Sequence, residues 1–297
     1  MSDPIYFIDR GSGERQEEQV YYEAVLRFLY TTKPGWTCAK LIAHLPFISK
    51  TTGWLERLPL SRRKIIPFIQ KYGLNPDEFV VSPENFSSFD DFFTRKLKPE
   101  TRPLTSGPII PADGRYLVYP DLNETSGFVV KGKTFSLEKL LGDDETLYSR
   151  YKHGSMVLAR LCPTDYHRFH FPCSGTPYKP HLINGPLYSV NPLALKKYLS
   201  ILVENKRVLT EIDTDTHGKL LYIEIGATSV GSIHQTFTPE KPVQKGDEKG
   251  FFSFGGSSLI LLFEPGAITF APDLLANSSQ FLETRCLFGQ SLTTLLK

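Results

Sequence analysis

Two histidines stand three residues apart in a short segment that also contains an acid and a cysteine. The segment is Asp165-Tyr-His-Arg-Phe-His-Phe-Pro-Cys173, and its imidazoles belong to His167 and His170. Imidazole titrates near neutral pH, so two such groups can act as acid and base in separate steps. The spacing His-x2-His-x2-Cys also permits a metal site, but the chain offers no second ligand cluster and we expect no metal. For this segment alone, a third interpretation is that both histidines are ordinary, partly buried residues without a catalytic role.

A carboxylate and a hydroxyl occur beside glycines elsewhere in the chain. Asp113 precedes a glycine in a turn-like context, which is weak evidence because Asp-Gly is a common turn dipeptide. Ser257 follows Gly255 and Gly256 and leads into an apolar run. The two glycines indicate either a simple hairpin or bulge, or a backbone free enough for the hydroxyl to attack its own preceding carbonyl. Together with a histidine, these residue types permit a nucleophile–base–acid triad.

The elements that must position these side chains can be predicted from periodicity. Short apolar or alternating segments flanked by Gly or Pro predict strands at residues 115–119, 156–161, 220–225 and 258–263. Helical spacing predicts an amphipathic helix over residues 17–30, and a second helix over residues 136–141 with Ser136 as its cap. Prolines around residues 98–111 mark a boundary. We therefore expect an α+β protein with a helical region at residues 1–100 and a mainly antiparallel β-rich catalytic domain at residues 101–297.

The composition of the 297 residues is that of an ordinary globular protein, with 40% hydrophobic and 22% charged residues. A net charge of +2 argues against a strongly basic nucleic-acid binder. No secretory signal is visible, and no apolar run approaches the roughly 20 residues that span a bilayer. The cysteines form no CxxC pair or dense framework, which favours a reducing compartment; they are Cys38, Cys162, Cys173 and Cys286.

Positive charge is concentrated in one segment. Residues 31–75 contain eight basic residues and one acid, a net +7, which leaves −5 for the rest of the chain. The segment also holds Trp36 and Trp54, the two tryptophans of the protein. Cations interleaved with aromatic and aliphatic residues on short helices are typical of a segment that lies in a membrane interface. A solvated basic face is the alternative.

Several motifs together resemble the phosphatidylserine decarboxylase proenzymes. The four main ones are Pro111-Ala-Asp-Gly114, Asp165-Tyr-His-Arg-Phe-His-Phe-Pro172, Gly226-Ala-Thr-Ser-Val-Gly-Ser-Ile233 and Lys245-Gly-Asp-Glu-Lys-Gly-Phe-Phe-Ser-Phe-Gly-Gly-Ser-Ser258. Supporting matches are Phe92-Phe-Thr-Arg-Lys-Leu-Lys-Pro99, Leu187-Tyr-Ser-Val-Asn-Pro192 and Leu287-Phe-Gly-Gln290. They run in the family order from about residue 85 to the C-terminus. Ser258 departs from the threonine that many members have after the cleavage serine, although serine also occurs there.

The resemblance implies a self-made cofactor. Asp113, His170 and Ser257 would form a maturation triad that cleaves the chain between Gly256 and Ser257, leaving a β chain of residues 1–256 and an α chain of residues 257–297. Ser257 would become a covalent pyruvoyl group, so that pyruvate is the cofactor and no other is needed. Glycine at position 256 would leave the attacked carbonyl uncrowded.

The activity implied is decarboxylation of phosphatidylserine to phosphatidylethanolamine and CO2. The pyruvoyl group would form a Schiff base with the substrate amine, and His167 would act as acid/base in the decarboxylation. The resemblance also implies helices that associate with an anionic membrane, a heterodimer of β and α chains with further dimerisation left open, no nucleic-acid partner, and a peripheral position on the cytoplasmic side of the cell membrane. The rival hypotheses are a serine hydrolase with an uncleaved Asp113/His170/Ser257 triad and a non-enzymatic membrane-binding module.

Overall fold

A ten-stranded sheet forms the centre of the computed structural model, which describes residues 4–20, 22–122, 136–227, 233–255 and 257–294. The strand order is β2-β1-β13-β3-β4-β12-β9-β8-β6, and β7 pairs with β8. Among the described strands every pair is antiparallel except β1 with β13. The strands of this sheet are β1 (Tyr6–Asp9), β2 (Arg15–Glu17), β3 (Gly114–Tyr119), β4 (Ser155–Leu161), β6 (Gly175–Pro177), β7 (His181–Ile183), β8 (Arg207–Thr214), β9 (Lys219–Ile225), β12 (Ser257–Phe263) and β13 (Glu283–Cys286).

The four predicted strands are confirmed as β3, β4, β9 and β12, which lie next to one another in the sheet. All residues of β3, β4 and β12 are buried, which explains why their sequences are almost uniformly apolar. Side chains along β12 alternate between two cores: Leu259 and Leu261 belong to one, and Ile260 and Leu262 to the other. By this alternation Ser257 shares the face of Leu259.

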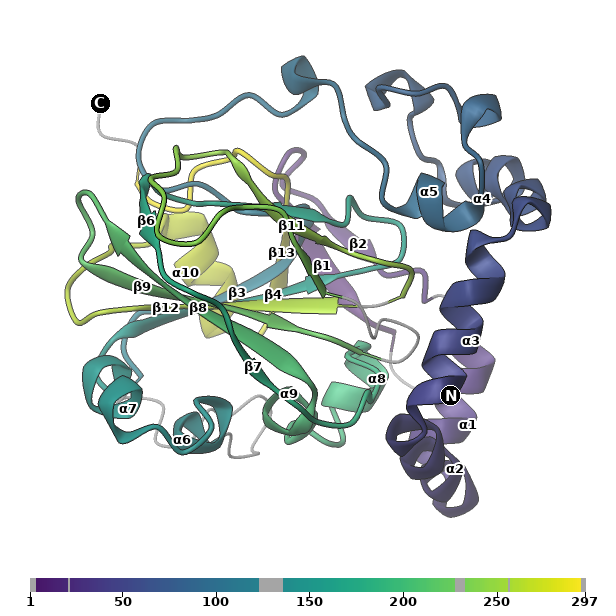
Figure 1. The fold of residues 1–297 in the computed structure, drawn as a ribbon, viewed down its shortest axis with the longest axis horizontal. Helices are drawn as coiled ribbons and strands as arrows, with labels where there is room; N and C mark the ends of the chain where they lie inside the picture. The colour runs from purple at the N-terminus through teal and green to yellow at the C-terminus, as the bar shows by residue number, and fades with distance from the viewer. Residues whose placement is uncertain (1–3, 21, 123–135, 228–232, 256, 295–297) are drawn as a thin grey trace.

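The two faces of the sheet are covered differently (Figure 1). A three-stranded sheet of β10 (Ile233–Gln235), β11 (Glu248–Phe252) and β5 (Arg168–His170), together with α10 (Pro272–Ser279), covers the core on the Leu259 side. The core on the opposite side is closed by short helices and by α1 (Glu23–Thr31) and α2 (Lys33–His44). Those short helices are α6 (Leu137–Leu140), α7 (Glu145–Tyr151), α8 (Pro192–Leu195) and α9 (Ile201–Glu204). The predicted cap is confirmed, because the side chain of Ser136 accepts a hydrogen bond from the Lys139 amide.

The N-terminal region is helical only after residue 22. The helices are α1 (Glu23–Thr31), α2 (Lys33–His44), α3 (Pro46–Arg57), α4 (Ile65–Tyr72) and α5 (Phe89–Phe93). The prediction of a helix from residue 17 was wrong at its start, because Glu17 ends β2 and the buried Glu18 carboxylate pairs with Arg160 at 2.9 Å. An acid that looks like a helix-start residue is in fact used for a buried ion pair.

Many apolar side chains on these helices face outward. Exposed examples along the segment include Val25, Phe28, Leu41 and Trp54. Trp36 differs, because its indole stacks on the Tyr198 ring with centroids 3.7 Å apart. In the part of the chain that the structure describes, no helix is both long and apolar enough to cross a bilayer.

Candidate active site

Ser257 opens β12 in the middle of the sheet. It pairs with Leu161 of β4, its side chain is fully buried, and its Oγ has no hydrogen-bond partner among the described residues. Gly255 has φ +135°, a backbone conformation that side-chain-bearing residues avoid, so glycine is required two residues before the serine. Gly256 lies outside the described residues. An unpartnered buried hydroxyl costs free energy. Ser258 shares this property, and Ser257 is distinguished as the candidate for chemistry by its place directly after the two glycines.

His167 is linked to this serine through strand β4. Its Nε2 is 3.0 Å from the carbonyl oxygen of Cys162, the residue after Leu161, and its ring stacks on Phe93 at 3.9 Å. A carbonyl only accepts, so Nε2 carries the hydrogen and Nδ1 keeps the lone pair. Nδ1 is buried and lacks a partner in the described structure. Burial lowers the pKa of His167 to about 3, so the ring is neutral at pH 7.

His170 ends β5 in the smaller sheet. Its Nδ1 donates to the Gly246 carbonyl at 2.9 Å, and its Nε2 accepts from the Tyr166 hydroxyl at 3.2 Å. Burial lowers the pKa of His170 to about 4, although the nearby Asp113 and Glu248 carboxylates raise it. His170 is therefore a neutral imidazole whose basic nitrogen faces a phenol.

Asp113 precedes β3 and is held by two partners. Its carboxylate forms an ion pair with Arg102 at 2.7 Å and accepts the Phe288 amide at 2.8 Å. The Phe288 ring stacks on His170 with centroids 3.8 Å apart, so Phe288 contacts two of the three predicted triad members, Asp113 and His170. The His170 amide also donates to Pro111, two residues before Asp113, at 2.8 Å. These contacts bring the two motifs together.

Within the described residues, no hydrogen bond joins Asp113, His170 and Ser257 to one another. Sequence reasoning also missed three side chains that hold the site, namely Arg102, Tyr166 and Phe288. Each lies in or beside a quoted motif, but no spacing rule assigns a contact to it. Only the fold shows that the segment around Phe288, 175 residues after Asp113, returns to the same place.

The helical region contacts the segment that leads to Ser257. The Asp90 carboxylate accepts the Phe254 amide at 2.9 Å and pairs with Arg57 at the end of α3 at 3.2 Å. The Phe254 ring packs in an aromatic cluster that includes Phe89 and Phe93. The region predicted to bind membranes is therefore attached directly to the chain just before Ser257.

Known proteins resemble the chain over almost its whole length. The family described as phosphatidylserine decarboxylase matches residues 89–294. Proteins named phosphatidylserine decarboxylase proenzyme are 51% identical over 98% of this chain and 97% of the relative in Chlamydia pneumoniae, and 50% identical over 97% of both chains in Chlamydia caviae. The corresponding protein of Chlamydia trachomatis serovar L2 is 45% identical over 97% of this chain and 96% of its own. The chain belongs to the phosphatidylserine decarboxylase family.

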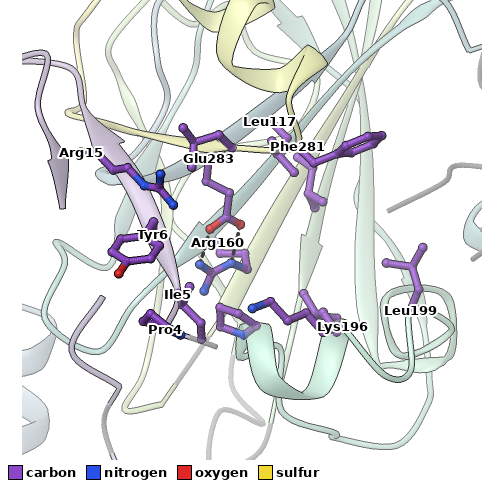
Figure 2. Close-up of a pocket in the computed structure, with 14 residues that line it drawn as sticks. Pro4, Ile5, Tyr6, Arg15, Leu117, Arg160, Lys196, Leu199, Phe281 and Glu283 are labelled. Atoms are coloured by element: carbon purple, nitrogen blue, oxygen red, sulfur yellow. Dashed lines mark hydrogen bonds and ion pairs between the residues drawn. The ribbon is translucent and has the colours of Figure 1, made fainter. Parts of the chain in front are cut away.

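A cavity of about 430 Å³ lies beside the candidate active site, and Asp113 and Tyr166 form part of its wall. A second cavity, of about 210 Å³, lies between β1, α8 and β13 and contains none of the predicted site residues (Figure 2). Its Arg160 is already paired with Glu283 at 2.5 Å. In the described parts of the chain, no three His, Cys, Asp or Glu side chains converge as metal ligands would. A third cavity, of about 470 Å³, lies between α7 and β8 and also contains none of the predicted site residues. The cavity of about 430 Å³ is the one connected to the site.

Proposed function

We propose that the chain is a proenzyme that cleaves itself between Gly256 and Ser257 and then decarboxylates phosphatidylserine to phosphatidylethanolamine and CO2. The observation that carries this proposal is the Ser257 hydroxyl, which is fully buried and unpartnered at the start of a central strand and follows Gly255, whose φ of +135° requires glycine. The names of the relatives give the substrate, and the word proenzyme in those names supports maturation by cleavage. The serine hydrolase alternative finds no support in this family.

Self-cleavage needs a base, a nucleophile and an orienting acid. We assign these roles to His170, Ser257 and Asp113. His170 is neutral at pH 7 and carries its hydrogen on Nδ1, so Nε2 is the nitrogen able to take the Ser257 proton. The Tyr166 hydroxyl donates a hydrogen bond to Nε2 in this structure, and this bond must break before Nε2 can accept the Ser257 proton. Attack of Oγ on the Gly256 carbonyl moves the acyl group from nitrogen to oxygen, and elimination then breaks the new ester.

Elimination followed by hydrolysis releases ammonia and leaves a pyruvoyl group at residue 257, at the head of an α chain of residues 257–297. The buried, unpartnered Ser257 side chain fits a residue that is converted in this way. A pyruvoyl ketone supplies the electron sink that loss of CO2 requires. His167 can hold or deliver a proton at Nδ1, because Nε2 is fixed on the Cys162 carbonyl. We therefore assign proton transfer during decarboxylation to His167.

The basic helical region would bring this site to its lipid substrate. Exposed apolar side chains on α1–α4 and the +7 segment are suited to the interface of an anionic membrane. We propose peripheral attachment on the cytoplasmic face of the cell membrane. The product of cleavage would be a heterodimer of β and α chains.

Intact mass measurement of the purified protein tests the proposal. We expect two chains of 256 and 41 residues, the shorter one blocked at its N-terminus by the pyruvoyl group. Ser257→Ala should remain one inactive chain because no oxygen nucleophile is left. Ser258→Ala is the matched control, since Ser258 is equally buried but points to the opposite face of β12, and it should be cleaved. A single uncut wild-type chain, or a cleaved Ser257→Ala, would refute the assignment.

A further inference from the structure

The cavity of about 430 Å³ opens where the helical region leaves and rejoins the body of the protein. One side of its rim is formed by Gln16, Glu17 and Gln19, at the end of β2 and just after it. The other side is Tyr72–Asn75, which begins at the last residue of α4. Deeper in the wall are Asp113 and Tyr166 of the candidate active site. The cavity therefore connects the predicted membrane-facing helices with the residues around His170.

Four guanidinium groups line this cavity, and three of them are already neutralised. Arg102 pairs with Asp113 at 2.7 Å and with Glu78 at 2.9 Å. Arg115 pairs with Asp165 at 2.5 Å, and Arg285 pairs with Asp9 at 2.7 Å. These ion pairs leave little attraction for a further anion at those three arginines. The fourth, Arg95, is different.

Arg95 is 95% buried, and none of the described carboxylates forms an ion pair with it. Its terminal nitrogens donate to the backbone carbonyls of Phe92, Thr164 and Asp165, and its Nε has no hydrogen-bond partner. The guanidinium group also packs against two aromatic rings, because its carbon lies 5.1 Å from the ring centroid of Phe79 and 4.9 Å from that of Phe92. Arg95 is thus a buried cation without a direct ion pair in the wall of the cavity, and its unpartnered Nε lies just beneath the surface of that wall.

Burial lowers the pKa of Arg95 to about 10, although the nearby Asp113 and Asp165 carboxylates, which form no ion pair with it, raise it. The group is still charged at neutral pH, and a buried unpaired charge is costly. An anion that enters the cavity would provide the missing counter-charge, and a small movement of the side chains that cover Nε would let it accept the missing hydrogen bond. Charge-assisted bonds from arginine to phosphate oxygens are among the strongest in proteins.

Contacts extend from Arg95 to the catalytic histidines. Phe93, two residues before it, stacks on His167, while Tyr166, which follows the carbonyl that Arg95 binds, contacts His170. A ligand held at Arg95 would therefore lie beside the site and would not occupy it.

We propose that this cavity is the subsite for the phosphodiester of the lipid headgroup and that Arg95 binds it, an inference that rests on the function proposed above. The headgroup carries two anions, a phosphodiester and a carboxylate. An ion pair to the carboxylate would stabilise the group that must leave as CO2 and so slow the reaction. The phosphodiester does not change during the reaction, which makes it the suitable partner for a fixed guanidinium.

Kinetics of Arg95→Lys test the proposal, because lysine keeps the charge but lacks Nε–H. We expect the KM for phosphatidylserine in vesicles to rise at least about tenfold, with kcat within about twofold of wild type and self-cleavage complete. Arg15→Lys is the control, since Arg15 is exposed on β2, outside both the +7 segment and the cavity wall, and its KM should not change. An unchanged KM in a folded, fully cleaved Arg95→Lys protein would overturn the proposal. If wild type fails to decarboxylate phosphatidylserine, the proposed function fails instead.

A second measurement leaves the cavity unaltered and does not depend on activity. Crystals of the Ser257→Ala proenzyme are soaked with glycerophosphoserine and, separately, with inorganic phosphate. The proposal expects the phosphate of glycerophosphoserine within hydrogen-bonding distance of Arg95 Nε, with its serine directed towards Tyr166. Binding of inorganic phosphate alone would assign the cavity to a free anion and reject the headgroup. A phosphate group bound elsewhere would also reject it.

Discussion

Both histidines of the site are neutral for the same reason, which is that burial disfavours the imidazolium. Their pKa values fall from 6.5 to about 3 for His167 and about 4 for His170. Each ring fixes its tautomer by donating to a backbone carbonyl, at Nε2 in His167 and at Nδ1 in His170. Two histidines three residues apart thus present opposite nitrogens, which supports separate roles for them.

These lowered pKa values predict how stability depends on pH. Between about pH 6.5 and pH 4 the unfolded chain binds protons that the folded histidines do not, so stability is fully present above pH 6.5 and falls as the pH falls. We expect the urea midpoint of the uncleaved Ser257→Ala protein to decrease from pH 7 to pH 5. Adding His167→Gln should make this decrease smaller. An equal decrease in both proteins would show that His167 is not buried as a neutral ring.

Sequence reasoning identified the residue types of the site but not its contacts. The spacing of His167 and His170 is visible in one short segment, and Ser257 is marked by its glycines. In contrast, Arg102 was only part of a proline-rich boundary, although it forms the ion pair to Asp113. Its role depends on a chain path that brings separate segments together, and no local pattern contains that information.

At the scale of elements, the proposed base and the proposed nucleophile lie on different sheets. His170 is on β5, which pairs with β11, whereas Ser257 is on β12 of the large sheet. A fully buried ion pair joins the two sheets: Lys249 on β11 contacts Glu224 on β9 at 2.5 Å. Lys249 lies where the pairing of β11 with β5 shifts register, directly after the partner of His170. This pair therefore fixes the position of one sheet relative to the other.

Removing one member of this ion pair should be much worse than removing both. Lys249→Met alone leaves a buried carboxylate without its cation and should lower the free energy of unfolding by about 3–5 kcal/mol. Adding Glu224→Gln removes the uncompensated charge and should recover at least half of that loss. Urea denaturation of the three proteins in the Ser257→Ala background measures both effects. Additive losses would contradict a direct coupling of the two side chains.

Strands with strong patterns were predictable, and elements stabilised by distant partners were not. The four central strands follow from their apolar runs and flanking glycines and prolines. The N-terminal strands β1 and β2 are short, and β1 is held by parallel pairing with β13, more than 270 residues away in the sequence. Such pairing leaves no local signal.

At the scale of the whole molecule, charge is distributed unevenly. The exposed Lys33, Lys40 and Arg63 lie in the +7 segment, beside outward-facing apolar side chains on the same helices. Because the remainder of the chain carries a net charge of −5, an anionic membrane surface would attract residues 31–75 and repel the rest of the protein. The helical region should therefore orient the protein as well as attach it.

Charge reversal tests this orientation. Changing Lys33, Lys40 and Arg63 to Glu should reduce binding to phosphatidylserine-containing vesicles by at least about tenfold, since each near-surface cation contributes about 1 kcal/mol. The matched control reverses Lys139, Lys179 and Lys241, three exposed lysines outside the segment, and should bind nearly as wild type. Co-sedimentation at several salt concentrations measures both. Equal losses in the two triple variants would mean that only net charge matters.

The place of β12 and β13 in the sheet has a consequence for the life of the protein. β12 lies between β4 and β9, and β13 between β1 and β3, so the α chain proposed above is woven through the β chain. The newly made polypeptide folds as one molecule, at a rate independent of its concentration. After cleavage, two separated fragments would have to meet again, which is slow in dilute solution. After maturation, a molecule that unfolds and loses one of its chains would therefore not refold efficiently. The working lifetime of the enzyme would depend on its rate of unfolding rather than on the equilibrium between folded and unfolded protein.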